Sequence, residues 1–199
     1  MPADTPSETL PFAPYPWSAD PTKRCSGRGA VISDDGLHRY HLWRCWDCTK
    51  PRLGWIMLNP STADANVDDP TIRRCIGFAR TWEYGGIEVV NLFGYRATNP
   101  ADLERCPVDV VGRDNRHHIR AMSNRCPIVI AAWGAHPQAT PLVVRMTLAA
   151  LVGQTQLYVL GLTKAGAPRH PLYVRGDAEP IRWAEPDGND GPRPRSTAP

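Results

Sequence analysis

"GWIMLNPSTAD", residues 54–64, begins as a buried strand and breaks off in polar residues. The run from Trp55 to Leu58 is apolar, whereas Asn59 and Pro60 open a string of small, turn-forming side chains. In an open α/β sheet, ligands bind outside the carboxyl ends of the strands. The stretch therefore predicts a core strand that delivers Asn59 to a site at the carboxyl edge of the sheet. There proline fixes the exit of the chain, and small residues let a ligand approach.

Strands and helices are predicted to alternate through the rest of the chain. Apolar or alternating runs indicate strands at 39–46, 53–58, 87–93, 127–134 and 156–163. Helical patterns occupy most of 68–86, 111–125 and 140–153. This order predicts an α/β fold with a mostly parallel, four-stranded central sheet and helices on both of its faces.

The helix predicted within 68–86 carries its own start and stop signals. Asp69 is placed to cap its amino end, and Pro70 suits its first turn. Gly85 and Gly86 are placed to stop it. We therefore expect this helix to connect the polar segment after the first core strand to the next strand.

Composition separates one folded domain from two tails. Residues 1–24 contain six prolines and few large apolar groups, and residues 184–199 are similarly rich in proline, glycine and polar side chains. We expect both tails to be extended or disordered and residues 25–183 to form a single domain. Apolar content of 42% and charged content of 22% are typical of globular proteins, and no apolar run is as long as a membrane span. Because no secretory signal is seen, we expect a cytoplasmic monomer without membrane association.

Neither the charge nor the cysteines identify a partner by themselves. The formal net charge of +3 permits a polyanionic ligand but does not require one. Among six cysteines, Cys45 and Cys48 form a CxxC pair. A zinc or iron–sulfur site would need two more ligands at recognisable spacing, and a second CxxC is missing. We therefore expect reduced thiols, no metal and no cofactor.

The other predicted strands also end in small or polar residues. "NLFGYRAT" (91–98), "AAWGAHP" (131–137) and "RHPLY" (169–173) join "LNPSTAD" (58–64) at these ends. Together they follow the pattern of a family known only as a domain of unknown function. More distantly, they resemble the uracil-DNA glycosylase superfamily in order and in strand context. The matching features are an Asn-Pro pair after the first core strand, an asparagine ending the second, a Trp-Gly pair on the third and a final His-Pro.

That resemblance implies a DNA glycosylase. Such an enzyme flips a base out of duplex DNA and hydrolyses its N-glycosidic bond, which leaves an abasic site and needs no cofactor. The resemblance gives Asn59 the role of holding the attacking water, and gives His170 that of stabilising negative charge on an oxygen of the departing base. Asparagine is a poor base, so Asp64 or Asp69 could supply the charge that Asn59 lacks. The residues alone also fit a strand-ending turn at Asn59 and a surface histidine at position 170.

Further residues are predicted to contact the substrate. An amide at the end of a buried strand is suited to reading a base edge, and an aromatic ring can stack on a flipped base. The competing interpretation is an amide satisfied by loop backbone for the asparagine, core packing for the aromatic rings and a solvated surface charge for the basic residues. The candidates for the base are Pro60, Ser61, Asn91, Phe93 and Tyr95, and those for DNA phosphates are Arg73, Arg74, Arg96 and Lys164.

The first motif also predicts the kind of base. In uracil-type relatives, a tyrosine after the proline blocks any group on the pyrimidine C5, whereas here Ser61, Thr62 and Ala63 are all small. An open wall removes the element that repels C5-substituted bases. Pyrimidines with bulky C5 groups, such as the hydroxymethylated or glucosylated cytosine of phage DNA, are therefore the predicted targets. Defence against phage is the corresponding biological hypothesis.

Other functions remain compatible with the sequence. An N-glycosidase acting on free nucleosides or nucleotides would use the same chemistry without DNA. A repair glycosylase would remove plain uracil or mismatched thymine. A catalytically inactive module could bind a nucleotide or modified DNA. Duplex binding, base specificity and turnover, respectively, separate these alternatives from the leading hypothesis.

Overall fold

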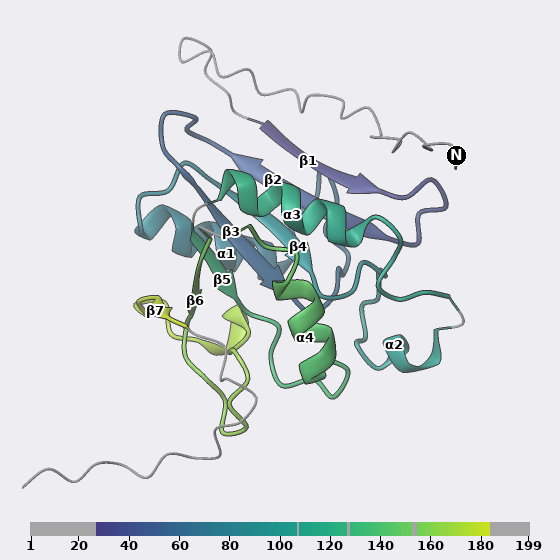
Figure 1. The fold of residues 1–199 in the computed structure, drawn as a ribbon. Helices are drawn as coiled ribbons and strands as arrows, with labels where there is room; N and C mark the ends of the chain where they lie inside the picture. The colour runs from purple at the N-terminus through teal and green to yellow at the C-terminus, as the bar shows by residue number, and fades with distance from the viewer. Residues whose placement is uncertain (1–26, 107, 127, 153–154, 184–199) are drawn as a thin grey trace, which may run out of the picture.

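The computed structural model describes residues 27–106, 108–126, 128–152 and 155–183. Its strands form one sheet in the order β1-β2-β4-β3-β5-β6-β7 (Figure 1). The strands are Gly27–Ile32 (β1), Arg39–Cys45 (β2), Arg52–Met57 (β3), Gly86–Asn91 (β4), Ile128–Ala131 (β5), Gln156–Val159 (β6) and Ile181–Arg182 (β7). The helices are Pro70–Thr81 (α1), Asp102–Arg105 (α2), Asn115–Arg125 (α3), Pro141–Leu148 (α4) and the 3₁₀ turn Pro171–Tyr173 (η1). The predicted tails at 1–24 and 184–199 lie outside the described residues.

The predicted four-stranded, mostly parallel sheet is wrong, because the sheet has seven strands and mixed directions. β3 pairs in parallel with β4 and β5, and β5 pairs in parallel with β6. β1 pairs antiparallel with β2, β2 pairs antiparallel with β4, and β7 pairs antiparallel with β6. Antiparallel strands therefore extend the parallel centre at both of its edges.

Weak sequence signals explain why β1 and β7 were not predicted. β1 begins with "GRG", and β7 consists of Ile181 and Arg182, both exposed. Edge strands need no continuous apolar run, because they are partly solvated. The alternating run at 39–46 does predict β2, but alternation does not say which strand it pairs with or in which direction.

Helix α1 begins where the sequence predicts and ends earlier. Asp69 Oδ1 accepts a hydrogen bond at 2.8 Å from a backbone N–H of the first turn. The helix ends at Thr81, and Glu83 beyond it adopts a left-handed conformation with φ of 60°. Gly85 serves close packing instead, since a Cβ there would lie 1.8 Å from Asp47 O. The predicted glycine stop is thus a tight contact at the start of β4.

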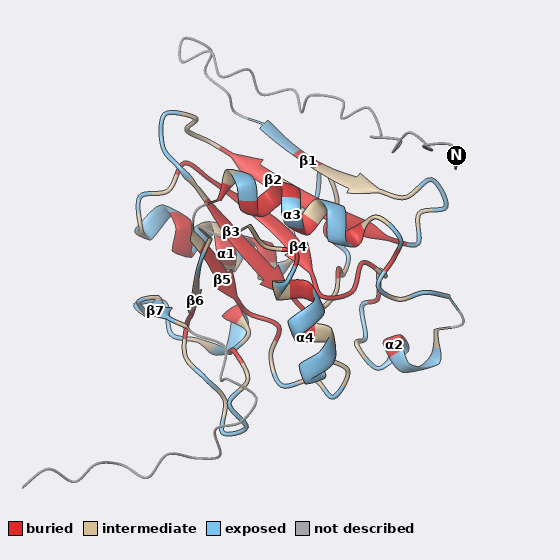
Figure 2. Ribbon diagram, viewed as in Figure 1, coloured by how far each residue is buried: buried red, intermediate tan, exposed pale blue. Residues whose placement is uncertain are grey.

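Helices cover both faces of the sheet (Figure 1), and an apolar core on each face holds them there. On one face, Ile56 and Val90 of the strands cluster with Met122 of α3. On the other face, Trp55 clusters with Phe78 of α1. The central strands are buried along most of their length, whereas β1 and β7 are partly or fully exposed (Figure 2). Burial of alternate side chains on both faces explains why the central strands are almost uniformly apolar.

A buried carboxylate stabilises β4 on the face that α3 covers. Glu88 Oε2 accepts hydrogen bonds from His41 Nε2 at 3.1 Å and Arg125 Nη2 at 2.7 Å, and Oε1 accepts one from Arg52 Nη1 at 3.0 Å. Burial opposes ionisation of Glu88, but the hydrogen bonds from His41 and Arg125 outweigh it and lower its pKa to about 2. Burial also lowers the pKa of His41, so its neutral ring donates to an ionised carboxylate at pH 7.

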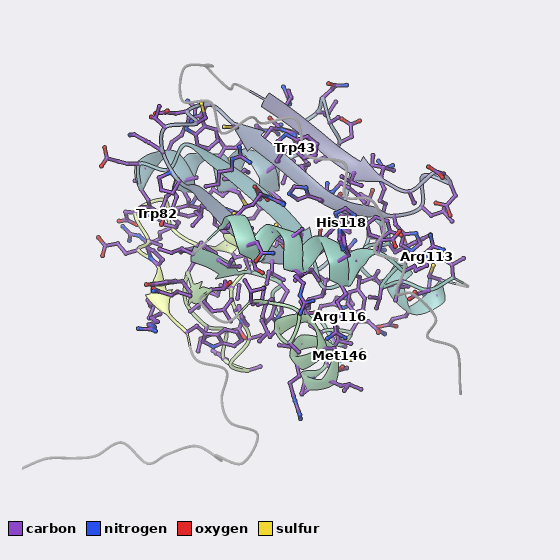
Figure 3. The ribbon with its side chains drawn as sticks, turned by 45° about the horizontal axis from the view of Figure 1, so that its top comes forward. Trp43, Trp82, Arg113, Arg116, His118 and Met146 are labelled. Atoms are coloured by element: carbon purple, nitrogen blue, oxygen red, sulfur yellow. The ribbon has the colours of Figure 1, made fainter. Side chains whose placement is uncertain are left out.

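The helices on the α3 face leave a shallow apolar groove between them. Arg116 of α3 and Met146 of α4, both labelled in Figure 3, line it together with Asn115 and Ile119. The groove lies on the α3 face, and Leu92, which directly follows β4, is among its lining residues. Across the described ranges, none of the helices has the length and apolar character required to cross a bilayer.

Candidate functional site

A pocket of about 370 Å³ lies at the carboxyl ends of the parallel strands, and we call it the strand-end pocket. Its volume is within the range of small-molecule sites. Four of the residues predicted from sequence line it, namely Asn59, Ser61, Asp69 and His170. The complete lining is Met57, Leu58, Asn59, Ser61, Asp69, Thr71, Ile72, Ala97, Thr98, Pro100, Trp133, Gly134, Ala135, His136, His170 and Tyr173.

The path of the chain after each strand explains why the pocket forms there. The segment after β3 leads to α1 on one face of the sheet. The segments after β4 and β5, which flank β3, lead to α3 and α4 on the other face. In such sheets a crevice opens where neighbouring connections leave toward opposite faces. The pocket therefore occupies the position that sheet topology favours for a ligand.

Hydrogen bonds hold the side-chain amide of Asn59 and leave its Oδ1 available in the pocket. Its Nδ2 donates hydrogen bonds to Pro60 O at 3.0 Å and to Ala97 O at 2.8 Å. These two carbonyl acceptors assign the orientation of the amide. No described residue donates to Oδ1, and Asn59 is half-buried in the pocket wall. Its oxygen is therefore fixed in position and available to a water molecule or a ligand.

Asp69 brings a carboxylate to the same pocket at the start of α1. Its Oδ1 is engaged as the helix cap, and no described residue donates a hydrogen bond to Oδ2. The charge of Asp69 favours the protonated form of His170, so the two groups interact electrostatically. The site thus contains an anion beside its imidazole, with one oxygen left to accept a proton or a hydrogen bond.

His170 presents a neutral imidazole to the pocket. Its Nδ1 accepts a long hydrogen bond of 3.4 Å from Leu172 N at the start of η1. The proton of the neutral ring is therefore on Nε2. Burial lowers the pKa of His170, and the charge of Asp69 opposes this shift without reversing it. At pH 7, Nε2–H is thus a donor suited to an oxygen on which negative charge develops.

Two buried arginines of β2, which sequence reasoning missed, hold the segment that carries Asn59 and Asp69. Arg39 Nη1 donates to Ala63 O at 2.8 Å. Arg44 Nη2 donates to the backbone oxygen of Asp64 at 2.7 Å. Burial lowers the pKa of Arg39 to about 10, which leaves it charged at pH 7. These bonds fix the 59–69 segment to the sheet, and fixed geometry is what a water-positioning site requires.

A bulge in β2 places Arg39 on the correct face. Val31 of β1 pairs with His41, but Ile32 pairs with Arg39, so Tyr40 is an extra residue in the strand. In a regular strand without a bulge, Arg39 and His41 are two residues apart and would share one face. With it, His41 reaches the α3 side while Arg39 reaches the segment after β3.

Trp133, His136 and Tyr173 also line the pocket and were not among the predicted site residues. Trp133 is almost fully buried and meets Trp183 edge to face at 5.6 Å between ring centroids. His136 is half-buried and follows β5 as His170 follows β6. The repeated His-Pro dipeptide after two neighbouring strands was the sequence signal for His136.

Predicted residues close to Asn59 have structural contacts of their own. Pro60 is buried, and its carbonyl accepts a hydrogen bond from Ala97 N at 2.9 Å. Asp64 Oδ1 accepts hydrogen bonds from two backbone N–H groups of the following turn, which lower the pKa of this carboxyl. Neither residue lines the strand-end pocket. Asp69 is therefore the aspartate placed to act in it.

The predicted substrate contacts at and after the end of β4 have partners inside the protein. Asn91 is buried, and its Oδ1 accepts a hydrogen bond from Arg39 Nη2 at 3.5 Å. Phe93 belongs to the core on the α3 side, and Tyr95 packs against that core. None of the three lines the pocket, so contact with a flipped base would require the segment to move.

Three of the four predicted phosphate contacts bind backbone oxygens of the protein. Arg73 donates to Asp68 O. Arg74 donates to Val174 O at 2.5 Å, and Arg96 donates to Gly36 O at 3.3 Å. These bonds occupy part of each guanidinium and hold neighbouring loops together.

Lys164 differs from these arginines because it is exposed beside the pocket. It lines a second cavity of about 340 Å³ together with Arg169 and Thr163. That cavity shares His170 and Tyr173 with the strand-end pocket, so the two are adjacent. An anionic group of a ligand bound at His170 would therefore find two cations close by.

The described residues include no group of three histidine, cysteine, aspartate or glutamate side chains placed to hold a metal ion. Burial raises the pKa of both Cys75 and Cys126, so these thiols stay protonated at neutral pH. The polar side chains that line the strand-end pocket are an amide, a carboxylate, two imidazoles and the hydroxyls of Ser61, Thr71, Thr98 and Tyr173.

Comparison with known proteins identifies one family. Residues 39–172 match a family described as "Protein of unknown function (DUF1643)". The match covers about two thirds of the chain and runs from β2 into η1, so it includes nearly all the segments that line the pocket. No curated protein and no solved structure matches the chain.

Proposed function

The chain belongs to the DUF1643 family, and we propose that it is a DNA glycosylase whose strand-end pocket receives a flipped base. One observation carries the proposal. The free oxygen of Asn59, the carboxylate of Asp69 and the neutral imidazole of His170 line a single pocket at the carboxyl edge of the sheet. Hydrolysis of an N-glycosidic bond needs these three functions together: a held water, an acceptor for its proton and a donor for the departing base.

The proposed reaction uses water alone. Asn59 Oδ1 orients a water molecule against the anomeric carbon of the sugar, and Asp69 accepts a proton from it as the new C–O bond forms. The bond between the sugar and the base breaks, and its electron pair leaves with the base. His170 Nε2–H donates a hydrogen bond to the base oxygen on which this charge accumulates. The products are an abasic sugar and the free base, which takes up a proton from solvent, while Asp69 releases the proton it accepted back to solvent.

Position 61 supports a C5-substituted pyrimidine as the substrate. Ser61, which follows Asn59 and Pro60, lines the pocket, and its small side chain leaves room there for a ligand. A bulky residue there would exclude groups on C5, whereas serine does not. Hydroxymethylated and glucosylated cytosines of phage DNA are bases of this kind, and defence against phage is the biological role that we propose.

A nucleosidase acting on free nucleosides or nucleotides is the second candidate. It is favoured by the arginines at 73, 74 and 96, which bind backbone oxygens of the protein and offer less of their charge to a DNA strand. Lys164 and Arg169, which line the adjacent cavity, suit either a DNA phosphate or the phosphate of a nucleotide, so the substrates must be compared directly.

The test is a substrate panel. The protein is incubated with duplexes that contain uracil, thymine opposite guanine, hydroxymethylcytosine or its glucosylated form, and abasic sites are then cleaved with alkali. The matching free nucleosides and nucleotides are incubated in parallel and analysed for released base. We expect the duplexes with C5-substituted pyrimidines to be cut fastest. Faster removal of plain uracil would indicate a repair enzyme, and release from nucleosides alone would indicate a nucleosidase. Binding of a duplex without turnover would indicate an inactive module.

A further inference from the structure

Two copies of one local motif face the strand-end pocket. "GAHPQ" (134–138) follows β5, and "PRHPL" (168–172) follows β6, so each contains a His-Pro dipeptide at its centre. Gly134 N donates a hydrogen bond to Pro168 O at 2.9 Å. These two residues stand two positions before His136 and His170, respectively. The bond therefore aligns the motifs side by side, and both histidines line the same pocket.

The two imidazoles have the same hydrogen-bonding arrangement. His136 Nδ1 accepts a hydrogen bond from Gln138 N at 3.3 Å, just as His170 Nδ1 accepts one from Leu172 N at 3.4 Å. A nitrogen that accepts cannot carry the proton of the neutral ring, so the proton lies on Nε2 in both. Each motif thus turns Nδ1 toward its own backbone and leaves Nε2–H for the pocket.

Gly134 makes the approach of the motifs possible. Its φ of 77° lies in the left-handed region, which glycine adopts without strain. A Cβ at this position would lie 3.8 Å from the Cβ of His170, so the backbone of one motif passes directly against the other histidine. The structure therefore places the backbone that leads to His136 against His170, and both histidines line one pocket.

We infer that His136 is a second substrate-binding residue, which works with His170 as a pair of Nε2–H donors to two acceptor atoms on one edge of the ligand. The inference rests on the proposed function, because the edge of a pyrimidine base carries at least two such acceptors. Two donors spread the negative charge of the departing base over two hydrogen bonds, and each strengthens as that charge grows. A specificity follows: a ligand with a single acceptor leaves one donor unpaired, which costs binding free energy.

A purely structural histidine would behave differently. The turn at 136–138 needs only a side-chain acceptor for the N–H of Gln138, and asparagine supplies one in the same kind of turn. The variant His136→Asn therefore keeps the turn and removes the imidazole Nε2–H from the pocket. His117→Asn is the matched control, since His117 is exposed on α3 and does not line the pocket.

The experiment has two readouts. In the first, imidazole nitrogen NMR of the full-length protein reports the protonated ring nitrogen of each histidine, and free uracil is titrated in as a probe with two carbonyl acceptors. We expect Nε2–H at both His136 and His170, with both signals shifting together as uracil binds. Protonation of His136 at Nδ1, or a shift at His170 alone, would overturn the inference whether or not the protein releases bases from DNA.

In the second readout, base release is measured under single turnover on the best duplex. We expect His136→Asn to slow the chemical step on the order of 10²-fold, the scale for loss of one such donor, while thermal stability matches that of His117→Asn. Release within about threefold of the wild type would also overturn the inference. If the wild type releases no base at all, the proposed function fails, and the NMR result alone decides the role of His136.

Discussion

Replacing Glu88 with glutamine is expected to destabilise the fold in a pH-dependent way. The carboxylate of Glu88 is fully buried between His41, Arg52 and Arg125. Glu88→Gln keeps the shape of the side chain but removes the anion and points an N–H₂ group at cations. Because Arg52 and Arg125 are partly buried beside Glu88, the substitution leaves their charge uncompensated rather than removing a neutral contact.

The size of the effect follows from the pKa of Glu88. Folding lowers this pKa from 4.5 to about 2. At 1.36 kcal/mol per pKa unit, the ionised carboxylate contributes about 3 kcal/mol to the free energy of unfolding at pH 7. A depressed pKa contributes stability that is fully present above the unfolded value and is lost as the pH falls toward the folded one. The contribution should therefore fall to about 1 kcal/mol by pH 3.

Urea denaturation of the wild type and the variant, repeated from pH 7 down to pH 3, measures this difference. The exposed Glu104→Gln is the control, and its free energy of unfolding should stay within about 0.5 kcal/mol of the wild type. We expect the penalty of Glu88→Gln to shrink steadily below about pH 5. A penalty that stays constant across this range would refute the assignment of a buried, ionised Glu88.

The remaining predictions concern the pocket and the cysteines. His170→Ala should slow base release by a factor on the order of 10² to 10³, and a change under about threefold in single-turnover rates would remove it from the site. Because burial lowers the pKa of His170 below its ordinary value of 6.5, the rate of release by the wild type should hold down to pH 6.5 and decline only at lower pH. A decline that already begins above pH 7 would contradict a neutral donor. Gly134→Ala should cost about 1–2 kcal/mol in urea denaturation because of its left-handed φ, whereas Gly77→Ala in the exposed interior of α1 should gain about 0.5–1 kcal/mol; equal effects would refute the backbone argument. Cys45→Ser and Cys48→Ser should each leave base release intact, and elemental analysis should find no stoichiometric zinc or iron. Finding either metal would overturn the prediction that these cysteines bind none.

The sequence predicted the parallel centre of the sheet better than its edges. Runs such as "GWIML" are apolar because both faces of β3 are covered, so burial leaves a direct trace in composition. β1 and β7 leave no such trace, because edge strands are stabilised by backbone pairing that many residue types permit. The helix stop at Gly85 was also misassigned, because the sequence does not distinguish a glycine needed for a close backbone contact from one needed to end a helix.

The site was predictable where it follows a strand directly. Asn59 lies two residues after the end of β3 and lines the pocket, whereas His170 lies eleven residues after the end of β6 and reaches the pocket from the loop beyond that strand. Asn91 satisfies the same rule but lies in the interior beside Arg39, because a single residue of register decides which way a side chain points. Arg39 itself reaches the site only through the bulge at Tyr40, and no periodicity reveals a bulge.

Single-turnover base release by Asn59→Ala tests most directly whether the strand-end pocket is a glycosylase site. The substrate is the duplex whose base the wild type releases fastest, and fluorescence anisotropy measures DNA binding in parallel. Asn66→Ala is the matched control, because Asn66 lies in the same segment but is exposed and outside the pocket. We predict that Asn59→Ala loses at least about 10²-fold in rate while binding DNA within a few fold, and that Asn66→Ala behaves as the wild type. Near wild-type release by Asn59→Ala, or no release by the wild type from any duplex, would contradict the proposed function.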